Sequence, residues 1–250
     1  MRQWLIRSVA PVLNLFLEAN CPLCGRSTAK ALCLDCQRQT SRCRLANPMA
    51  TWQGDLPLFA WGAYKGSLKR TIAALKYENQ PQIAQLLGHW LGEAWLTYTS
   101  DWKTQTSSHP WIGSPWVVPI PLHTLKLRQR GFNQADLLAE SFCAATGLPL
   151  VRKGLVRVRQ TKAQFSLTAE ERQRNLADSF QIGQAFKRLS TNPSVLLLDD
   201  IYTTGSTALA AAKTLQRRGI AVIGIGAIAR PLKFPSQSVK EREIGCIFEA

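Results

Sequence analysis

The sequence has few acidic residues and no apolar run long enough to cross a membrane. Only 16 Asp and Glu accompany 31 Lys and Arg, which leaves a formal net charge of +15. Met1–Asn20 is rich in apolar side chains, but Arg7, Asn14 and Glu18 interrupt it, and no small-residue cleavage site follows. We therefore expect an amphipathic N-terminal helix, rather than a signal peptide or a membrane span, and a cytoplasmic protein.

Internal repeats and low-complexity tracts are also absent, which argues against a solenoid or a disordered chain. With 46% hydrophobic residues in 250, the chain can bury the core of one main domain plus an appendage. The scarcity of acidic residues indicates a polyanionic partner such as nucleic acid, acidic lipid or a phosphorylated ligand. A basic soluble protein with a solvated cationic surface is the alternative.

The cysteine count is odd, and most of the seven cysteines lie between Cys21 and Cys43. This crowding favours a metal site in a reducing compartment over a disulfide framework. Two C-x-x-C pairs have the spacing of a structural zinc ribbon, so we predict that Zn²⁺ is bound by Cys21, Cys24, Cys33 and Cys36. A second zinc site is not expected, because Cys43 has no partner cysteine nearby, and its role stays open.

From Phe59 onward, alternating helix and strand signals predict an α/β domain with a parallel sheet flanked by helices. Apolar side chains at helical spacing, and one capping box, predict helices over Ser67–Lys76, Gln82–Tyr98, Asn133–Thr146, Thr168–Asp178 and Ser206–Arg218. Apolar runs predict buried strands over Trp116–Pro121, Val195–Leu198 and Ile220–Ala229. We predict two units: an N-terminal helix and zinc-ribbon module over 1–46, and a larger domain over 58–250.

The strongest local signal is the loop Asp199-Asp-Ile-Tyr-Thr-Thr-Gly-Ser-Thr207, which follows a buried strand. Ligands of open α/β sheets bind at the carboxyl ends of the strands. Backbone amides, hydroxyl groups and a helix dipole converge on a phosphate there, and Gly205 allows a close approach. Paired carboxylates beside a phosphate cradle suit a ligand that carries both a diol and a phosphate. In the plainer interpretation, the two aspartates end a strand and the following residues cap a helix.

This loop resembles the phosphoribosyl pyrophosphate signature of type I phosphoribosyltransferases. The resemblance implies a type I fold that binds this ligand with Mg²⁺. It also implies that Asp199 and Asp200 hold the ribose hydroxyls. The 5-phosphate would then be bound by Thr203, Thr204, Gly205, Ser206 and Thr207. A preceding loop would bind pyrophosphate through Ile120, Pro121, Leu122 and Arg130. Purine-salvage enzymes carry an aspartate proton acceptor where this chain has Thr203, which weakens a purine-salvage interpretation.

Further motifs extend the resemblance to nearly the whole chain. The cysteine pairs, Leu75-Lys-Tyr77, Pro119-Ile-Pro121, Arg130-Gly-Phe-Asn-Gln134 and the phosphate loop occur in an order that resembles the ComF/GntX family. The resemblance implies a competence factor that acts on incoming single-stranded DNA during natural transformation, beside a DNA-uptake helicase or channel protein. Basic residues outnumber acidic ones between Leu125 and Arg174, and the predicted polyanion surface comprises Lys126, Arg128, Arg130, Arg159, Lys162 and Arg172.

Two other functions stay open at this point. The domain could be a metabolic phosphoribosyltransferase, although no acceptor pocket and no catalytic residue can be identified from the sequence. It could also be a regulatory module that senses phosphoribosyl pyrophosphate. Trp102 and Trp111 could stack on nucleic acid, but packing is the more ordinary role of tryptophan in a polar, turn-rich segment.

Overall fold

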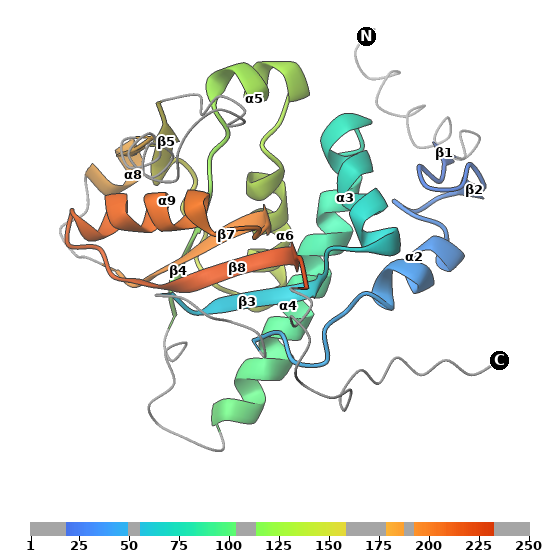
Figure 1. Cartoon of the computed structure of the whole chain (residues 1–250), viewed down its shortest axis with the longest axis horizontal. Helices are drawn as coiled ribbons and strands as arrows, with labels where there is room; N and C mark the ends of the chain where they lie inside the picture. The colour runs from blue at the N-terminus through green and yellow to red at the C-terminus, as the bar shows by residue number, and fades with distance from the viewer. Residues whose placement is uncertain (1–18, 50–55, 104–113, 159–178, 188–192, 233–250) are drawn as a thin grey trace, which may run out of the picture.

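A four-stranded parallel sheet forms the centre of the molecule (Figure 1). The structure, a computed structural model, describes residues 19–49, 56–103, 114–158, 179–187 and 193–232. The strand order is β3-β8-β7-β4, and every pairing in this sheet is parallel. The strands are β3 (Leu58–Ala63), β4 (Trp116–Pro119), β7 (Val195–Ile201) and β8 (Val222–Arg230).

Helices cover both faces of this sheet, which confirms the predicted α/β class (Figure 1). One face packs against α3 (Gly66–Tyr77), α4 (Gln82–Lys103) and α6 (Gln134–Thr146), and the other against α9 (Ser206–Gln216). Neighbouring residues of a strand point to opposite faces, so Leu196 joins the first core and Leu197 the second. The continuous apolar run at the start of β7 therefore reflects a strand that is buried on both sides.

The predicted helices form because their apolar positions share one face. Leu68, Ile72 and Leu75 of α3 are all almost fully buried. Helix α6 begins after Asn133, whose side-chain oxygen accepts the N–H of Ala135 at 3.3 Å. The predicted helix Thr168–Asp178 lies outside the described residues, as do Arg159, Lys162, Arg172, Trp111 and the side chain of Trp102.

Smaller elements surround the sheet. They are β1 (Ala19–Asn20), β2 (Ser27–Thr28), α2 (Leu34–Ser41), α5 (Thr124–Arg130), β5 (Leu155–Arg157), β6 (Phe180–Ile182) and α8 (Gln184–Lys187). The pairs β1-β2 and β5-β6 are antiparallel. None of the helices in the described ranges combines the length and the apolar character that a bilayer crossing requires.

The segment 19–43, here called the cysteine module, packs directly on the domain. The buried hydroxyl groups of Thr40 in α2 and Thr71 in α3 are 3.2 Å apart. After α2 the chain reaches the edge of the sheet, where the N–H of Ala63 donates to the carbonyl of Cys43 at 2.8 Å. Buried residues of the module, Cys21 and Leu32 among them, belong to the same core as α3 and α4. Unfolding of the module would therefore expose one side of α3.

Candidate ribose-phosphate site and cysteine cluster

The predicted phosphate loop turns tightly from β7 into α9. Gly205 caps the helix with φ of 76°, a left-handed conformation that favours glycine. A methyl group at this position would lie 2.2 Å from the hydroxyl oxygen of Tyr202. The left-handed conformation and the Tyr202 ring together therefore disfavour a side chain at Gly205.

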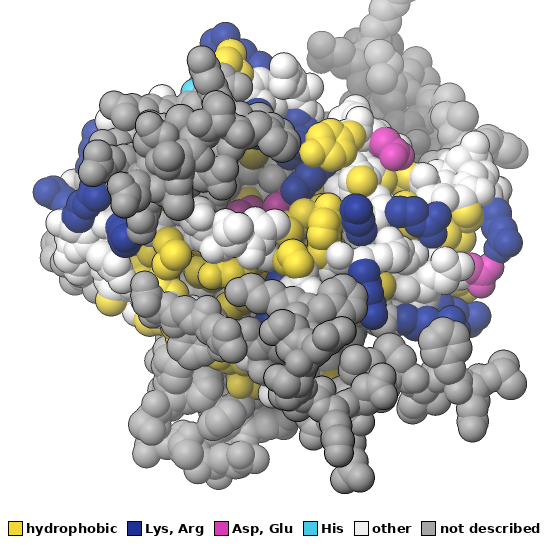
Figure 2. Space-filling view, viewed as in Figure 1, with side chains coloured by type: hydrophobic (Ala, Val, Ile, Leu, Met, Phe, Trp, Pro, Cys, Tyr) yellow, Lys and Arg dark blue, Asp and Glu magenta, His cyan; other side chains and the backbone are white. Residues whose placement is uncertain are grey.

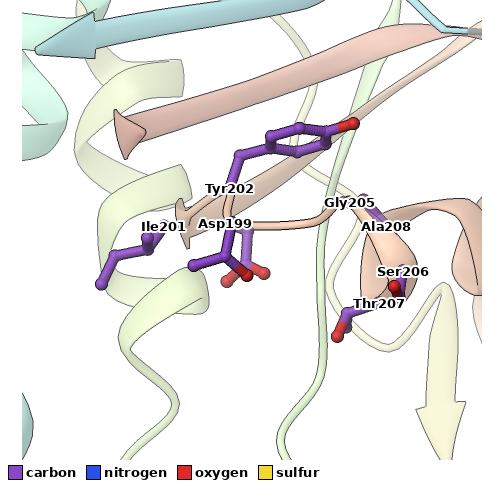
Figure 3. Close-up of a pocket in the computed structure, with 8 residues that line it drawn as sticks. Asp199, Ile201, Tyr202, Gly205, Ser206, Thr207 and Ala208 are labelled. Carbon is purple, nitrogen blue, oxygen red and sulfur yellow. The ribbon is translucent and has the colours of Figure 1, made fainter. Parts of the chain in front are cut away.

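A small pocket of about 40 Å³ lies inside this loop, and it brings together five residues predicted from the sequence. Its walls are formed by Asp199, Ile201, Tyr202, Thr203, Gly205, Ser206, Thr207 and Ala208. In Figure 3 the Asp199 carboxylate and the hydroxyl groups of Ser206 and Thr207 lie on the same side of the loop, whereas the Tyr202 ring lies on the other. Hydrogen-bond acceptors and donors thus face one space, as a ligand with both a diol and a phosphate requires.

The hydroxyl groups of the loop are arranged by contacts within it. The Thr204 hydroxyl is 2.8 Å from that of Ser206, and it accepts the Ser206 N–H at 3.4 Å. The N–H of Asp200 donates to the Asp199 carboxylate at 2.8 Å. These contacts order the loop and the start of α9, whose first N–H groups have no partner within the helix and can bind an anion.

Asp200 points away from this pocket, towards α3. Its carboxylate lies 2.6 Å from the ammonium group of Lys76, and the side chains are only 5% and 17% exposed. The strand alternation explains the direction, because Asp199 and Asp200 must face opposite sides of the sheet. Lys76 was not predicted as a site residue, because no local sequence pattern connects the end of α3 with the end of β7.

The two carboxylates influence each other. Burial raises the pKa of Asp199 well above its usual value, and the neighbouring charge of Asp200 raises it further. Lys76 and the Asp200 N–H act in the opposite direction. Asp199 therefore keeps its proton to a higher pH than a free aspartate does.

The loop after β4 is held by the sheet and by α6. The N–H of Ile120 donates to the Leu198 carbonyl at 2.9 Å, and the Ile120 carbonyl accepts from the Asn133 side-chain amide at 3.2 Å. Pro121 has no N–H to offer. The amide of Ile120 therefore orders the loop, and a direct role in pyrophosphate binding stays a prediction for Leu122 and Arg130.

A groove of about 430 Å³ lies between the ends of α3 and α5. Its walls are formed by Lys76, Tyr77, Asn79, Gln129, Arg130 and Gly131. The Arg130 guanidinium lies 5.6 Å from the centre of the Tyr77 ring, and it also contacts the Gln134 carboxamide. Figure 2 shows acidic side chains at the bottom of a hollow on this face, with basic and hydrophobic side chains beside it. Tyr77 was not predicted as a site residue.

The four predicted metal ligands come together in the cysteine module. The sulfur atoms of Cys21, Cys24, Cys33 and Cys36 all lie within 4.8 Å of one another. The sulfur atoms of Cys24 and Cys33 are 3.5 Å apart. Zinc–sulfur bonds of about 2.3 Å in a tetrahedron place the sulfurs about 3.8 Å apart, so the cluster has the size of a zinc site.

The other described cysteines have structural roles. Cys43 is buried, and its thiol donates to the Lys65 carbonyl at 3.6 Å, so it joins the cysteine module to the start of α3. Burial raises the pKa of Cys143 in α6 to about 12, which makes this thiol unreactive. The interpretation of Cys143 as a small buried hydrophobe is confirmed, while Cys246 lies outside the described residues.

No protein-family model matches the chain, but known proteins do. Competence protein F of Haemophilus influenzae is 30% identical over 169 residues, which cover 68% of this chain and 70% of that protein. This chain belongs to the ComF family. Competence protein ComFC of Bacillus subtilis is 29% identical and covers 80% of the chain and 72% of its own length. DNA utilization protein YhgH of Salmonella typhimurium is 29% identical, over 85% of this chain and 84% of that protein.

Solved structures similar to this ComF-family chain include phosphoribosyltransferases. An adenine phosphoribosyltransferase has a TM-score of 0.36 and 15% identity, over 57% of this chain and 69% of that one. The adenine phosphoribosyltransferase of Leishmania tarentolae has a TM-score of 0.36 and 13% identity, over 78% of this chain and 86% of that one. Similarity of this degree gives no information about the acceptor or the chemistry of the ComF-family site.

Proposed function

We propose that this protein binds phosphoribosyl pyrophosphate, or a related ribose phosphate, and acts on incoming single-stranded DNA in natural transformation. The observation that carries the proposal is the pocket at the end of β7, where the Asp199 carboxylate and the Ser206 and Thr207 hydroxyls face one space. Asp199 would accept hydrogen bonds from the ribose, and the N-terminus of α9 would hold the 5-phosphate. Mg²⁺, when bound with the ligand, would neutralise its pyrophosphate.

The cysteine cluster would hold one structural Zn²⁺. Four cysteine sulfurs at this separation form a tetrahedral set that suits zinc, and they leave no ligand position open for chemistry. Burial opposes ionisation of Cys21, but backbone hydrogen bonds at Cys33, Leu23 and Cys24 lower the pKa of its thiol to about 7. One of the four ligands is thus readily available as the thiolate that a metal requires.

The names of the relatives support the DNA part of the proposal. Competence protein F and ComFC are named for competence, and YhgH for DNA utilization. In this chain, Lys126 and Arg128 are exposed on α5, and Arg130 lines the groove beside the ribose-phosphate site. Arg152, in contrast, pairs with Glu140 at 2.7 Å, so its charge is partly neutralised. Helix α5 is therefore a described surface that suits DNA phosphates.

A salt titration tests the DNA proposal. We expect oligothymidylate to bind with an affinity that falls as salt increases, and Lys126→Ala/Arg128→Ala to lower the slope of log K against log salt by about 0.7 for each lost phosphate contact. Fluorescence anisotropy measures this slope. The control is Lys213→Ala/Arg218→Ala, which removes the same charge from exposed positions in and just after α9. An α5 variant that keeps the wild-type affinity, or an equal loss in both variants, would contradict a DNA surface on α5.

A further inference from the structure

The groove between α3 and α5 contains an unusually exposed aromatic ring. Tyr77, the last residue of α3, is 78% exposed, and no other Phe, Tyr or Trp whose side chain the structure describes is exposed. A single exposed tyrosine is ordinary on a protein surface, so the inference depends on the groups that surround this ring in the groove. The guanidinium of Arg130 lies 5.6 Å from the ring centre, which limits the positions the ring adopts.

The remaining walls of the groove offer polar groups to a flat ligand. Asn79 and Gln129 carry carboxamides that can both donate and accept hydrogen bonds, and Arg130 carries a positive charge, whereas the charge of Lys76 is paired with Asp200. A volume of about 430 Å³ is ample for one aromatic base with part of its sugar. An aromatic face, a guanidinium, amides and positive charge together match a nucleotide better than an apolar peptide side chain.

One wall of the groove contacts the loop that carries the proposed ribose-phosphate site. Lys76 lines the groove, and its ammonium group pairs with Asp200 of the phosphate loop at 2.6 Å. Lys126 and Arg128, on the helix that ends at the groove, are exposed and can contact the phosphates of a strand that enters it.

From these observations, which extend the DNA-binding function proposed above, we infer that the groove binds an unstacked base of single-stranded DNA. The base stacks on the free face of Tyr77, and Arg130 supports the stack. Such stacking tolerates any base, because every base has a π face, and it suits a protein that handles DNA of arbitrary sequence.

Alanine and phenylalanine variants of Tyr77 separate stacking from charge. We expect Tyr77→Ala to weaken oligothymidylate binding about tenfold with an unchanged salt slope, and Tyr77→Phe to bind like the wild type. An oligomer of abasic sites should bind equally to the wild type and to Tyr77→Ala, because it has no base to stack. The control is Lys69→Ala, which removes the cation that lies 6.0 Å from the Tyr64 ring, at the opposite end of α3. Melting temperatures of all variants verify that they fold.

Three results would overturn this inference, and each of them rejects a different part of the account. Equal affinity of Tyr77→Ala and wild type for oligothymidylate would reject the groove and leave the proposed function intact. Absence of any binding by the wild type would reject the groove and DNA binding together. If free thymine binds saturably at Tyr77 while oligothymidylate binds elsewhere on the protein, the groove is a site for a small acceptor molecule and not for a DNA strand.

Discussion

Removal of zinc is expected to unfold the cysteine module and to destabilise the domain on which it packs. Zinc in ribbon-type modules contributes an apparent binding free energy of about 10 to 16 kcal/mol, which the small apolar content of such a segment cannot replace. Cys21 and Cys36 are buried, and they share their core with α3. We therefore expect a strong chelator to release about one zinc ion per chain and to lower the melting temperature by about 10 °C or more.

Single cysteine variants identify the ligands. Cys24→Ser should lose zinc, as measured by a colorimetric zinc assay on the purified protein, because it lacks one of the four ligands. The Cys24 thiol is exposed, so its removal does not disturb the core. Cys43→Ser is the matched control, since Cys43 lies in the same segment but outside the four-cysteine cluster. Full zinc content in Cys24→Ser, or a chelated protein that melts like the zinc-loaded one, would contradict this assignment.

The second large effect is expected at Lys76. Breaking a buried ion pair by removal of one partner commonly costs about 3 to 5 kcal/mol, because the remaining charge stays buried without compensation. We expect Lys76→Met to lower the free energy of unfolding by about 3 kcal/mol near neutral pH, measured by urea denaturation. Adding Asp200→Asn to this variant should restore most of the loss, whereas Lys69→Met on the exposed side of α3 should change little.

The effect of Lys76→Met should depend on pH. The pKa of Asp199 is higher in the folded protein than in the unfolded chain. The stability that the folded state gains by binding the Asp199 proton is therefore present in acid, and it is lost as pH rises through the folded-state pKa. Lys76 lowers the pKa of Asp199, so without Lys76 that pKa rises further and the loss of stability grows in the same direction. We therefore expect a smaller loss of stability at about pH 5 than at about pH 8. A loss that is the same at both pH values would show that Lys76 stabilises the fold by packing alone.

The helices and strands were largely predictable because their apolar patterns are strong. The alternation of strand and helix around β7 and α9 follows from apolar side chains that must be buried. Gly147, with φ of 73°, marks the end of α6. The spacing of the two C-x-x-C pairs likewise predicted the cysteine cluster. Each of these features depends on residues that are close in sequence.

Contacts between distant segments were not predictable in the same way. Nothing near Lys76 in the sequence indicates that it pairs with Asp200, and nothing near Tyr77 indicates a groove shared with Arg130. The role of Cys43 also depends on its contact with Lys65, which only the folded chain reveals. Sequence patterns predicted a phosphate loop after β7, whereas only the packing of α3 and α5 in the folded chain determines which residues lie beside that loop.

The most direct test of the ribose-phosphate site is a calorimetric titration of Mg²⁺–phosphoribosyl pyrophosphate into the zinc-loaded protein and into Asp199→Ala/Asp200→Ala. We expect saturable binding to the wild type and none to the double variant, because the variant lacks the Asp199 carboxylate that would accept hydrogen bonds from the ribose hydroxyls. Absence of binding to the wild type, or equal binding to both proteins, would contradict a ribose-phosphate site at the end of β7.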